Sequence, residues 1–118
     1  MSRVIPHDAP IYVAGHTGLV GSAIVRCLEA DGYTNLLLAS RQELDLRDQS
    51  VVDAWFAERR PAFVFLVAGT VGGVLENSRY PAEFLYDNLM IHCTVVDAAF
   101  KQGVEKLLYL GSSCVYPR

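Results

Sequence analysis

Three glycines at regular spacing, Gly15, Gly18 and Gly21, indicate a ligand-binding turn of the backbone. They follow a short apolar run, residues 11–14, and precede a segment with apolar residues at helical spacing. Glycines at such a turn let the backbone approach a diphosphate, and the start of the helix offers unpaired amides and a positive dipole end. The pattern predicts a dinucleotide-binding loop made of Gly15, His16, Thr17, Gly18, Leu19, Val20 and Gly21. The alternative is a plain glycine turn that binds nothing.

The kind of dinucleotide depends on the residues that end the second apolar run, 36–40. In NAD-binding domains a carboxylate about 20 residues beyond the glycines bonds the ribose 2′-hydroxyl. Here Arg41 follows the run directly, and Glu43 is the first carboxylate. Because a guanidinium suits a 2′-phosphate, we expect Arg41 to bind that phosphate and the cofactor to be NADP(H) rather than NAD(H). The alternative is that Arg41 is a solvated surface charge.

The surrounding residues predict strands that alternate with helices. Apolar runs indicate strands at 11–15, 36–40, 63–68 and 106–111, and helical periodicity indicates helices at 19–30, after the N-cap residue Asp48, and at 82–102. This order, β-α-β-α-β-α-β, predicts an α/β fold with a Rossmann-type parallel sheet in the strand order 3-2-1-4. We expect the first two helices on one face and the third on the other. Residues 1–118 form a single NAD(P)-binding domain in this interpretation.

Composition narrows the classes of partner. The chain has 118 residues, of which 52% are hydrophobic and 19% charged, and its net charge of −3 argues against binding nucleic acid or an anionic membrane. No apolar run is long enough to span a bilayer. The three cysteines, Cys27, Cys93 and Cys114, have no metal-ligand spacing, so we expect reduced thiols, no metal site and a cytoplasmic location. Cys27 and Cys93 fall within predicted helices, where we expect them to be packed.

The long helix at 82–102 is apolar on more than one face. One face must pack on the sheet, and the remainder needs a second partner. We expect a homodimer through this helix. Burial beneath further chain is an equally weighted alternative, and the two are compatible.

Several motifs together are similar to those of one enzyme family. They are AGHTGLVGSAI at residues 14–24, VGG at 71–73, YPA at 80–82, NLMI at 88–91 and GSSCVYP at 111–117. This combination resembles the GDP-L-fucose synthase family of extended short-chain dehydrogenases/reductases, over roughly the first third of the family's length. The resemblance implies NADPH as cofactor. It also implies epimerisation of GDP-4-keto-6-deoxy-mannose at C3 and C5, followed by hydride reduction at C4.

The resemblance also implies roles for individual residues. Ser112 would hydrogen-bond the C4 keto oxygen, although Ser113 could be confused with it, and Cys114 would be the base at C3 and C5. The alternatives are a strand-capping hydroxyl and an inert thiol. Asp45 would lie near the adenine and Asn88 near the nicotinamide. The remaining expected site residues are Ala68 and Gly69 for the cofactor, and Val71, Gly72 and Gly73 for the sugar.

Two features depart from the family pattern. Thr17 and Thr70 stand where the family commonly has Arg and Lys, which removes positive charge near the cofactor. The superfamily's Tyr-x-x-x-Lys proton donor does not occur in the 118 residues, so we expect a chain truncated after its fourth strand and inactive alone. Two alternatives stay open: a fragment of another NAD(P)-dependent nucleotide-sugar epimerase/dehydratase, or a non-catalytic dinucleotide-binding module.

Overall fold

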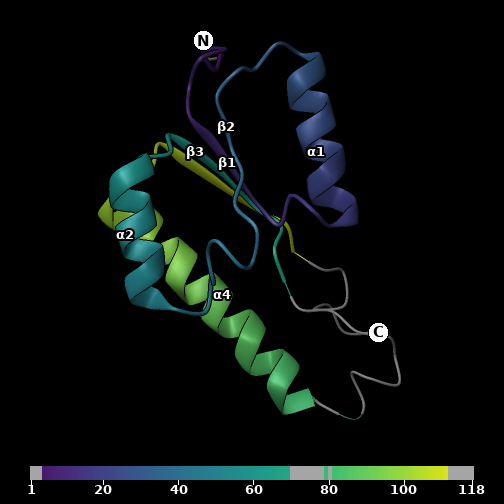
Figure 1. Ribbon diagram of the computed structural model, residues 1–118, viewed down its shortest axis with the longest axis vertical. Coiled ribbons are helices and arrows are strands. Elements are labelled where there is room, and N and C mark those ends of the chain that lie inside the picture. Colours follow the sequence, from purple (N-terminus) through teal and green to yellow (C-terminus); the bar gives the residue numbers. More distant parts are fainter. Residues whose placement is uncertain (1–3, 70–78, 80, 112–118) are drawn as a thin grey trace.

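The computed structural model describes residues 4–69, 79 and 81–111, and Figure 1 shows their arrangement. Strands and helices alternate along the chain, as the sequence predicts. The elements are β1 (Ile11–Ala14), α1 (Leu19–Ala30), β2 (Leu36–Leu37), α2 (Gln49–Arg59), β3 (Phe63–Leu66), α4 (Pro81–Lys101) and β4 (Lys106–Tyr109). No helix in these ranges is long and apolar enough to cross a membrane.

The strands form one parallel sheet in the order β2-β1-β3-β4. Ile11 of β1 is in register with Leu36 on one side and Phe63 on the other, and Phe63 is in register with Lys106. The Rossmann-type parallel sheet is therefore confirmed. The predicted order 3-2-1-4 is wrong for these strands, because the third strand lies beside β1 and not outside β2.

The difference between the observed and the predicted strand order has a physical cause in the segment that follows β2. That strand is only Leu36–Leu37, and no strand is formed between it and β3, although Leu44 is buried and Leu46 packs on the core. The chain therefore returns past β1 before it forms its third strand. The predicted order assigned to residues 63–68 the place outside β2, whereas β3 takes the place of strand four.

The observed strand order also determines which helices share a face of the sheet. A right-handed crossover from β1 to β2 runs in one direction across the sheet, whereas those from β2 to β3 and from β3 to β4 run in the other. Reversing the direction places the connecting helix on the opposite face. Accordingly, among the described helices α1 covers one face by itself and α2 and α4 cover the other, not the first two helices together as predicted (Figure 1).

The larger core lies between the sheet and the pair α2 and α4. Tyr12 and Ala14 of β1 pack there with buried residues of the neighbouring strand and both helices. Ile11 and Val13 are also buried and, because side chains alternate along a strand, face α1. Burial of β1 on both faces explains why its sequence is a continuous apolar run. The members of the larger core are Tyr12, Ala14, Leu44, Val52, Phe56, Val64, Leu66, Ile91, Val95, Ala98 and Ala99.

Candidate functional site

A cavity of about 280 Å³ lies where β1, β2 and β3 end. Each strand contributes the residues just after its carboxyl end, which is where open α/β sheets bind ligands. The segment 44–47 and one side of α4 complete the wall. The lining residues are Tyr12, Gly15, His16, Thr17, Gly18, Ala39, Ser40, Arg41, Leu44, Asp45, Leu46, Arg47, Val67, Ala68, Gly69, Asp87 and Ile91.

The glycine turn has two positions at which only glycine fits. Gly15 has a φ of 93°, and a Cβ atom there would lie 2.8 Å from the backbone nitrogen of Ala68. A Cβ atom on Gly21 would lie 1.9 Å from the carbonyl oxygen of Gly15. Gly18 differs, because its φ is −77° and its Cβ would meet the same oxygen at an ordinary 3.5 Å. Gly15 and Gly21 thus set the close packing of strand, turn and helix, while Gly18 keeps the cavity side of the turn open.

The N-cap residue of α1 borders this cavity, and the helix begins there without a capping side chain. Its N-cap is Gly18, which makes no side-chain hydrogen bond, and its first turn carries no acidic residue. In α2, by contrast, the Asp48 carboxylate accepts hydrogen bonds from the amides of Ser50 and Val51. An uncapped N-terminus with its positive dipole end suits an anion that comes from outside the chain. Leu19 is 88% exposed and does not line the cavity, so any contribution from this position comes from its backbone.

Arg41 is exposed and lines the cavity beside the end of β2. Its Nη2 donates a hydrogen bond to the carbonyl oxygen of Gly69, 3.4 Å away, which is a neutral partner. Glu43 does not line the cavity, because it turns back to Ser40, whose Oγ donates to Glu43 Oε1 at 3.2 Å. The site therefore presents a guanidinium, and not Glu43, where the second strand ends.

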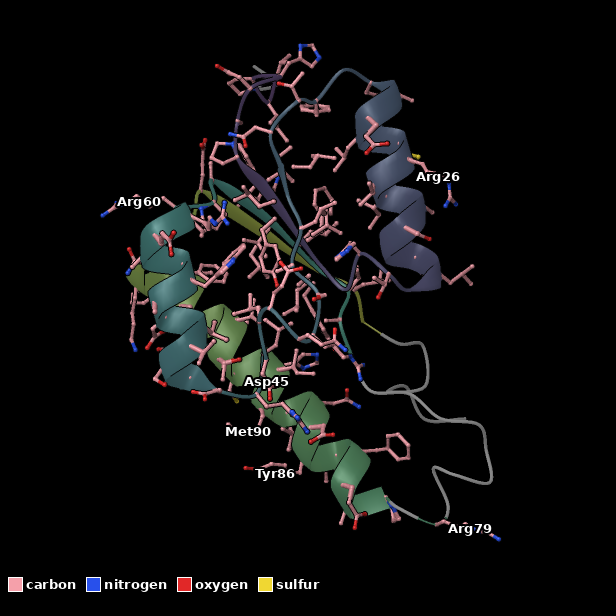
Figure 2. The ribbon with its side chains drawn as sticks, viewed as in Figure 1. Arg26, Asp45, Arg60, Arg79, Tyr86 and Met90 are labelled. Atoms are coloured by element: carbon pink, nitrogen blue, oxygen red, sulfur yellow. The ribbon has the colours of Figure 1, made fainter. Side chains whose placement is uncertain are left out.

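Three labelled arginines of the described ranges lie outside the cavity. Figure 2 labels Arg26 on the outside of α1, Arg60 beyond the end of α2 and Arg79 ahead of α4, and none of the three lines the cavity. Arg41 and Arg47 are the arginines that line it within the described residues.

Arg47 joins two carboxylates across the wall of the cavity. Its Nε and Nη2 donate to the two oxygens of Asp45 at 3.0 and 3.1 Å, and its Nη1 donates to Asp87 Oδ1 at 3.4 Å. Hydrogen bonds from Arg47 lower the pKa of Asp45 below its usual value, and those two carboxylates raise the pKa of Arg47. Neither Arg47 nor Asp87 was predicted from the sequence. Asp87 lies 40 positions from Arg47, so no local pattern could reveal the pair.

The structure brings most of the predicted cofactor residues together. Those that line the cavity are Gly15, His16, Thr17, Gly18, Arg41, Asp45, Ala68 and Gly69. Asn88 lies close behind, since a Cβ atom on Gly69 would be 3.1 Å from Asn88 Oδ1. Leu19, Val20 and Gly21 begin α1 without lining the cavity. Val71, Gly72, Gly73, Ser112, Ser113 and Cys114 lie outside the described residues.

Two cysteines do not follow the prediction. Cys27 and Cys93 lie on α1 and α4, but both are exposed and not packed in the core. Each falls outside the stripe of its helix that meets the sheet. Both are free thiols.

Comparison with known proteins now gives the family. The sequence model of the NAD dependent epimerase/dehydratase family matches residues 11–118. The chain belongs to this family. It is 49% identical to GDP-L-fucose synthase 1 of Arabidopsis thaliana over 118 residues, which is all of this chain and 36% of that protein. It is 48% identical to GDP-L-fucose synthase of Escherichia coli (strain K12) over 108 residues, 92% of this chain and 34% of that protein.

A solved structure of a reductase is also similar to this chain. The NADP-bound structure of MlghC, a GDP-mannoheptose C4 reductase from Campylobacter jejuni, superposes with a TM-score of 0.92 at 41% identity. That match covers 97% of this chain and 36% of the reductase. The resemblance to GDP-L-fucose synthases inferred from the motifs is confirmed. The chain spans about a third of the length of the relatives it matches.

Proposed function

We propose that this chain binds NADP(H) and is the cofactor-binding part of a GDP-L-fucose synthase-like epimerase/reductase. The observation that carries the proposal is the cavity at the carboxyl edge of the sheet, where the uncapped start of α1 and Arg41 border the same space. The first suits a diphosphate and the second suits a further phosphate on the adjoining ribose. The reductase structure with NADP bound, which is similar over nearly the whole chain, supports this assignment.

The preference for NADP(H) over NAD(H) rests on the charges at the end of β2. Arg41 lines the cavity with a neutral carbonyl as its partner, so its charge is available to a phosphate. Asp45 and Asp87 also line the cavity, but both are paired with Arg47. Since Glu43 is turned back to Ser40, it does not take the place of the usual ribose-binding carboxylate.

Titration of the chain with NADPH and NADH, followed by the fluorescence of the reduced nicotinamide, tests this proposal. We expect saturable binding of NADPH and weaker binding of NADH. Equal affinities would contradict the assignment of the 2′-phosphate, and absence of binding by either would contradict the cofactor site itself.

For the whole enzyme, of which this chain would be the cofactor-binding part, we propose the reaction that the resemblance implies. It is 3,5-epimerisation of GDP-4-keto-6-deoxy-mannose followed by NADPH-dependent reduction at C4, with Ser112 and Cys114 as catalytic residues. Ser113, Val71, Gly72 and Gly73 would contact the sugar, and Asn88 the nicotinamide region. The relatives named GDP-L-fucose synthase support this choice over another nucleotide-sugar epimerase.

The 118 residues should bind cofactor without completing that reaction. They contain no tyrosine with lysine four positions later, so the superfamily's proton donor is not present in them. We expect no oxidation of NADPH when the purified chain is given GDP-4-keto-6-deoxy-mannose. Measurable oxidation would contradict this expectation.

We further propose that the protein is a cytoplasmic homodimer that associates through α4. Leu85, Leu89, Val96 and Phe100 form an exposed apolar stripe on this helix, separate from the buried residues that meet the sheet. Repetition every three to four residues is the pattern of a helix that packs on another helix. The free thiols of Cys27 and Cys93 are in keeping with a reducing compartment.

A further inference from the structure

Arg47 uses its donors in a way that separates its role from that of Arg41. Nε, Nη1 and Nη2 all point at carboxylate oxygens, two of them at Asp45 and one at Asp87. The single positive charge of a guanidinium between two carboxylates is more than neutralised by them, so it attracts a phosphate only weakly. Arg41, whose partner is a neutral carbonyl, keeps that task.

The same contacts orient the Asp45 carboxylate. Its Oδ1 accepts from the Arg47 backbone amide and from Nε, both at 3.0 Å, which uses the two lone pairs of that oxygen. Its Oδ2 accepts from Nη2 at 3.1 Å and retains capacity for one more donor. The carboxylate is half exposed and borders the cavity, so a bound molecule can reach that oxygen.

Contacts with helix α4 fix the position of the segment 44–47, which carries Asp45 and Arg47. Asp87 and Thr94 both lie on α4, and Thr94 Oγ1 donates a hydrogen bond to the carbonyl oxygen of Leu46. Leu44 is buried in the core at the start of the same segment. In Figure 2 Asp45 lies beside α4, in agreement with the ion pair between Arg47 and Asp87. The segment 44–47 is thus fixed on both sides of Asp45.

We propose that Arg47, braced by Asp87, is a positioning residue that aims Asp45 Oδ2 at the exocyclic amine of the cofactor's adenine. This inference rests on the proposed function, because it assumes that a dinucleotide occupies the cavity with its adenine near Asp45, as the resemblance to GDP-L-fucose synthases implies. Arg47 acts through Asp45 and does not touch the cofactor. Its effect is therefore on discrimination between purine bases and not on the preference for the 2′-phosphate.

The test compares NADPH with its deamino analogue, in which hypoxanthine replaces adenine and a carbonyl oxygen replaces the amine. The unmodified chain should bind NADPH about 10- to 150-fold more tightly than the analogue, the size of one charged hydrogen bond. Arg47→Met keeps the stem and the backbone amide but removes every side-chain donor, and should reduce that ratio to near one. The ratio of NADPH to NADH affinity should stay unchanged in this variant, whereas Arg41→Ala should change it and keep the base preference.

The pH dependence of binding gives a readout that a purely structural role would not move. Arg47 lowers the pKa of Asp45, with a smaller contribution from Arg41, while Asp87 and Asp48 are the nearby carboxylates. Affinity for NADPH should be lost as pH falls through the Asp45 pKa, and this midpoint should move to higher pH in Arg47→Met. Arg47→Lys keeps the charge without the fork and should restore part of that shift, with circular dichroism confirming that each variant is folded.

The outcomes distinguish failure of the positioning role from failure of the proposed function. A base ratio and pH midpoint in Arg47→Met equal to those of the unmodified chain would overturn the positioning role. Equal loss of NADPH and deamino-NADPH would also overturn it, because it would indicate general damage to the site. If the unmodified chain bound neither, the proposed function itself would be wrong, and this inference with it.

Discussion

The backbone of Gly21 packs directly on the carbonyl oxygen of Gly15, leaving room for a hydrogen atom but not for a methyl group. A Cβ atom at this position would lie 1.9 Å from that oxygen and 2.6 Å from its carbon. Both partners are backbone atoms, so neither can rotate away. This contact sets the distance between α1 and the end of β1, and with it the direction in which the helix N-terminus points.

Gly21→Ala should therefore destabilise the fold. The helix must move away from the turn, and overpacking of this kind costs about 1–3 kcal/mol. Urea denaturation should show the free energy of unfolding lowered by that amount. NADPH binding should weaken as well, because the amides of the first turn are displaced. An unchanged denaturation midpoint would contradict the packing described above.

Gly18→Ala is the matched control within the same turn. Its φ of −77° suits any residue, and its Cβ would make an ordinary contact at 3.5 Å. We expect stability close to that of the unmodified chain. Because Gly18 lines the cavity, the methyl group should keep a diphosphate from the backbone and weaken NADPH binding at least about tenfold. Strong destabilisation by this variant would show that the two glycines do not have separate roles.

Arg41→Ala tests the preference between the two cofactors. Loss of a charged hydrogen bond should weaken NADPH binding by about 1.5–3 kcal/mol, while NADH binding should hardly change. Fluorescence titrations of both cofactors at one salt concentration give the comparison. Equal losses for NADPH and NADH would mean that Arg41 does not bind the 2′-phosphate.

The N-cap of α2 predicts a pH-dependent contribution to stability. Hydrogen bonds from Ser50 and from the amide of Val51 lower the pKa of Asp48 in the folded chain. A carboxyl group with a lowered folded pKa stabilises the fold above its unfolded pKa, and this contribution is lost as pH falls through the folded value. Asp48→Ala should lower the Tm by about 5 °C at neutral pH.

Asp48→Asn separates charge from hydrogen bonding at this cap. The amide oxygen still accepts the backbone donors, so the Tm at neutral pH should fall less than in Asp48→Ala. The difference in Tm between the unmodified chain and Asp48→Asn should shrink as pH falls from about 6 to below about 3. A difference that stays constant over this range would rule out a contribution from the carboxylate charge.

Local signals in the sequence were enough to predict the elements. The helix at Leu19–Ala30, the Asp48 cap and the apolar run of β1 could each be predicted from a few neighbouring residues, and the structure confirms them. The glycine turn and Arg41 were predicted to lie at the same edge of the sheet, and both line the cavity there. Parallel strands share a carboxyl edge, so the order of elements alone implies this proximity.

The order of the strands and the wall of the cavity could not be predicted from local sequence signals, because both depend on contacts between distant segments. The position of β3 beside β1 could be predicted only if it were known that no strand forms between β2 and α2. In the sequence, however, the buried Leu44 and the partly buried Leu46 resemble the residues of a short strand. The error in strand order carried the helices to the wrong faces. The bond between Arg47 and Asp87 depends on α4 lying against the segment 44–47, which follows from that same arrangement.

The exposed stripe on α4 predicts association of two copies. Leu89→Glu places a charge in the centre of the stripe and should shift the protein from dimer to monomer in sedimentation experiments. Val51→Asp is a control, since Val51 is comparably exposed on α2 but does not belong to the stripe. A monomeric unmodified chain, or a dimer that tolerates Leu89→Glu, would contradict the homodimer.

The crystal structure of the chain with NADPH bound is the most direct measurement of where the cofactor lies. We expect the diphosphate at the start of α1, hydrogen-bonded to backbone amides that follow Gly18, with the 2′-phosphate beside Arg41 and the adenine against Asp45. A complex in which the cofactor lies elsewhere on the molecule, with the turn at Gly15–Gly21 vacant, would contradict the assignment of the cavity and everything derived from it.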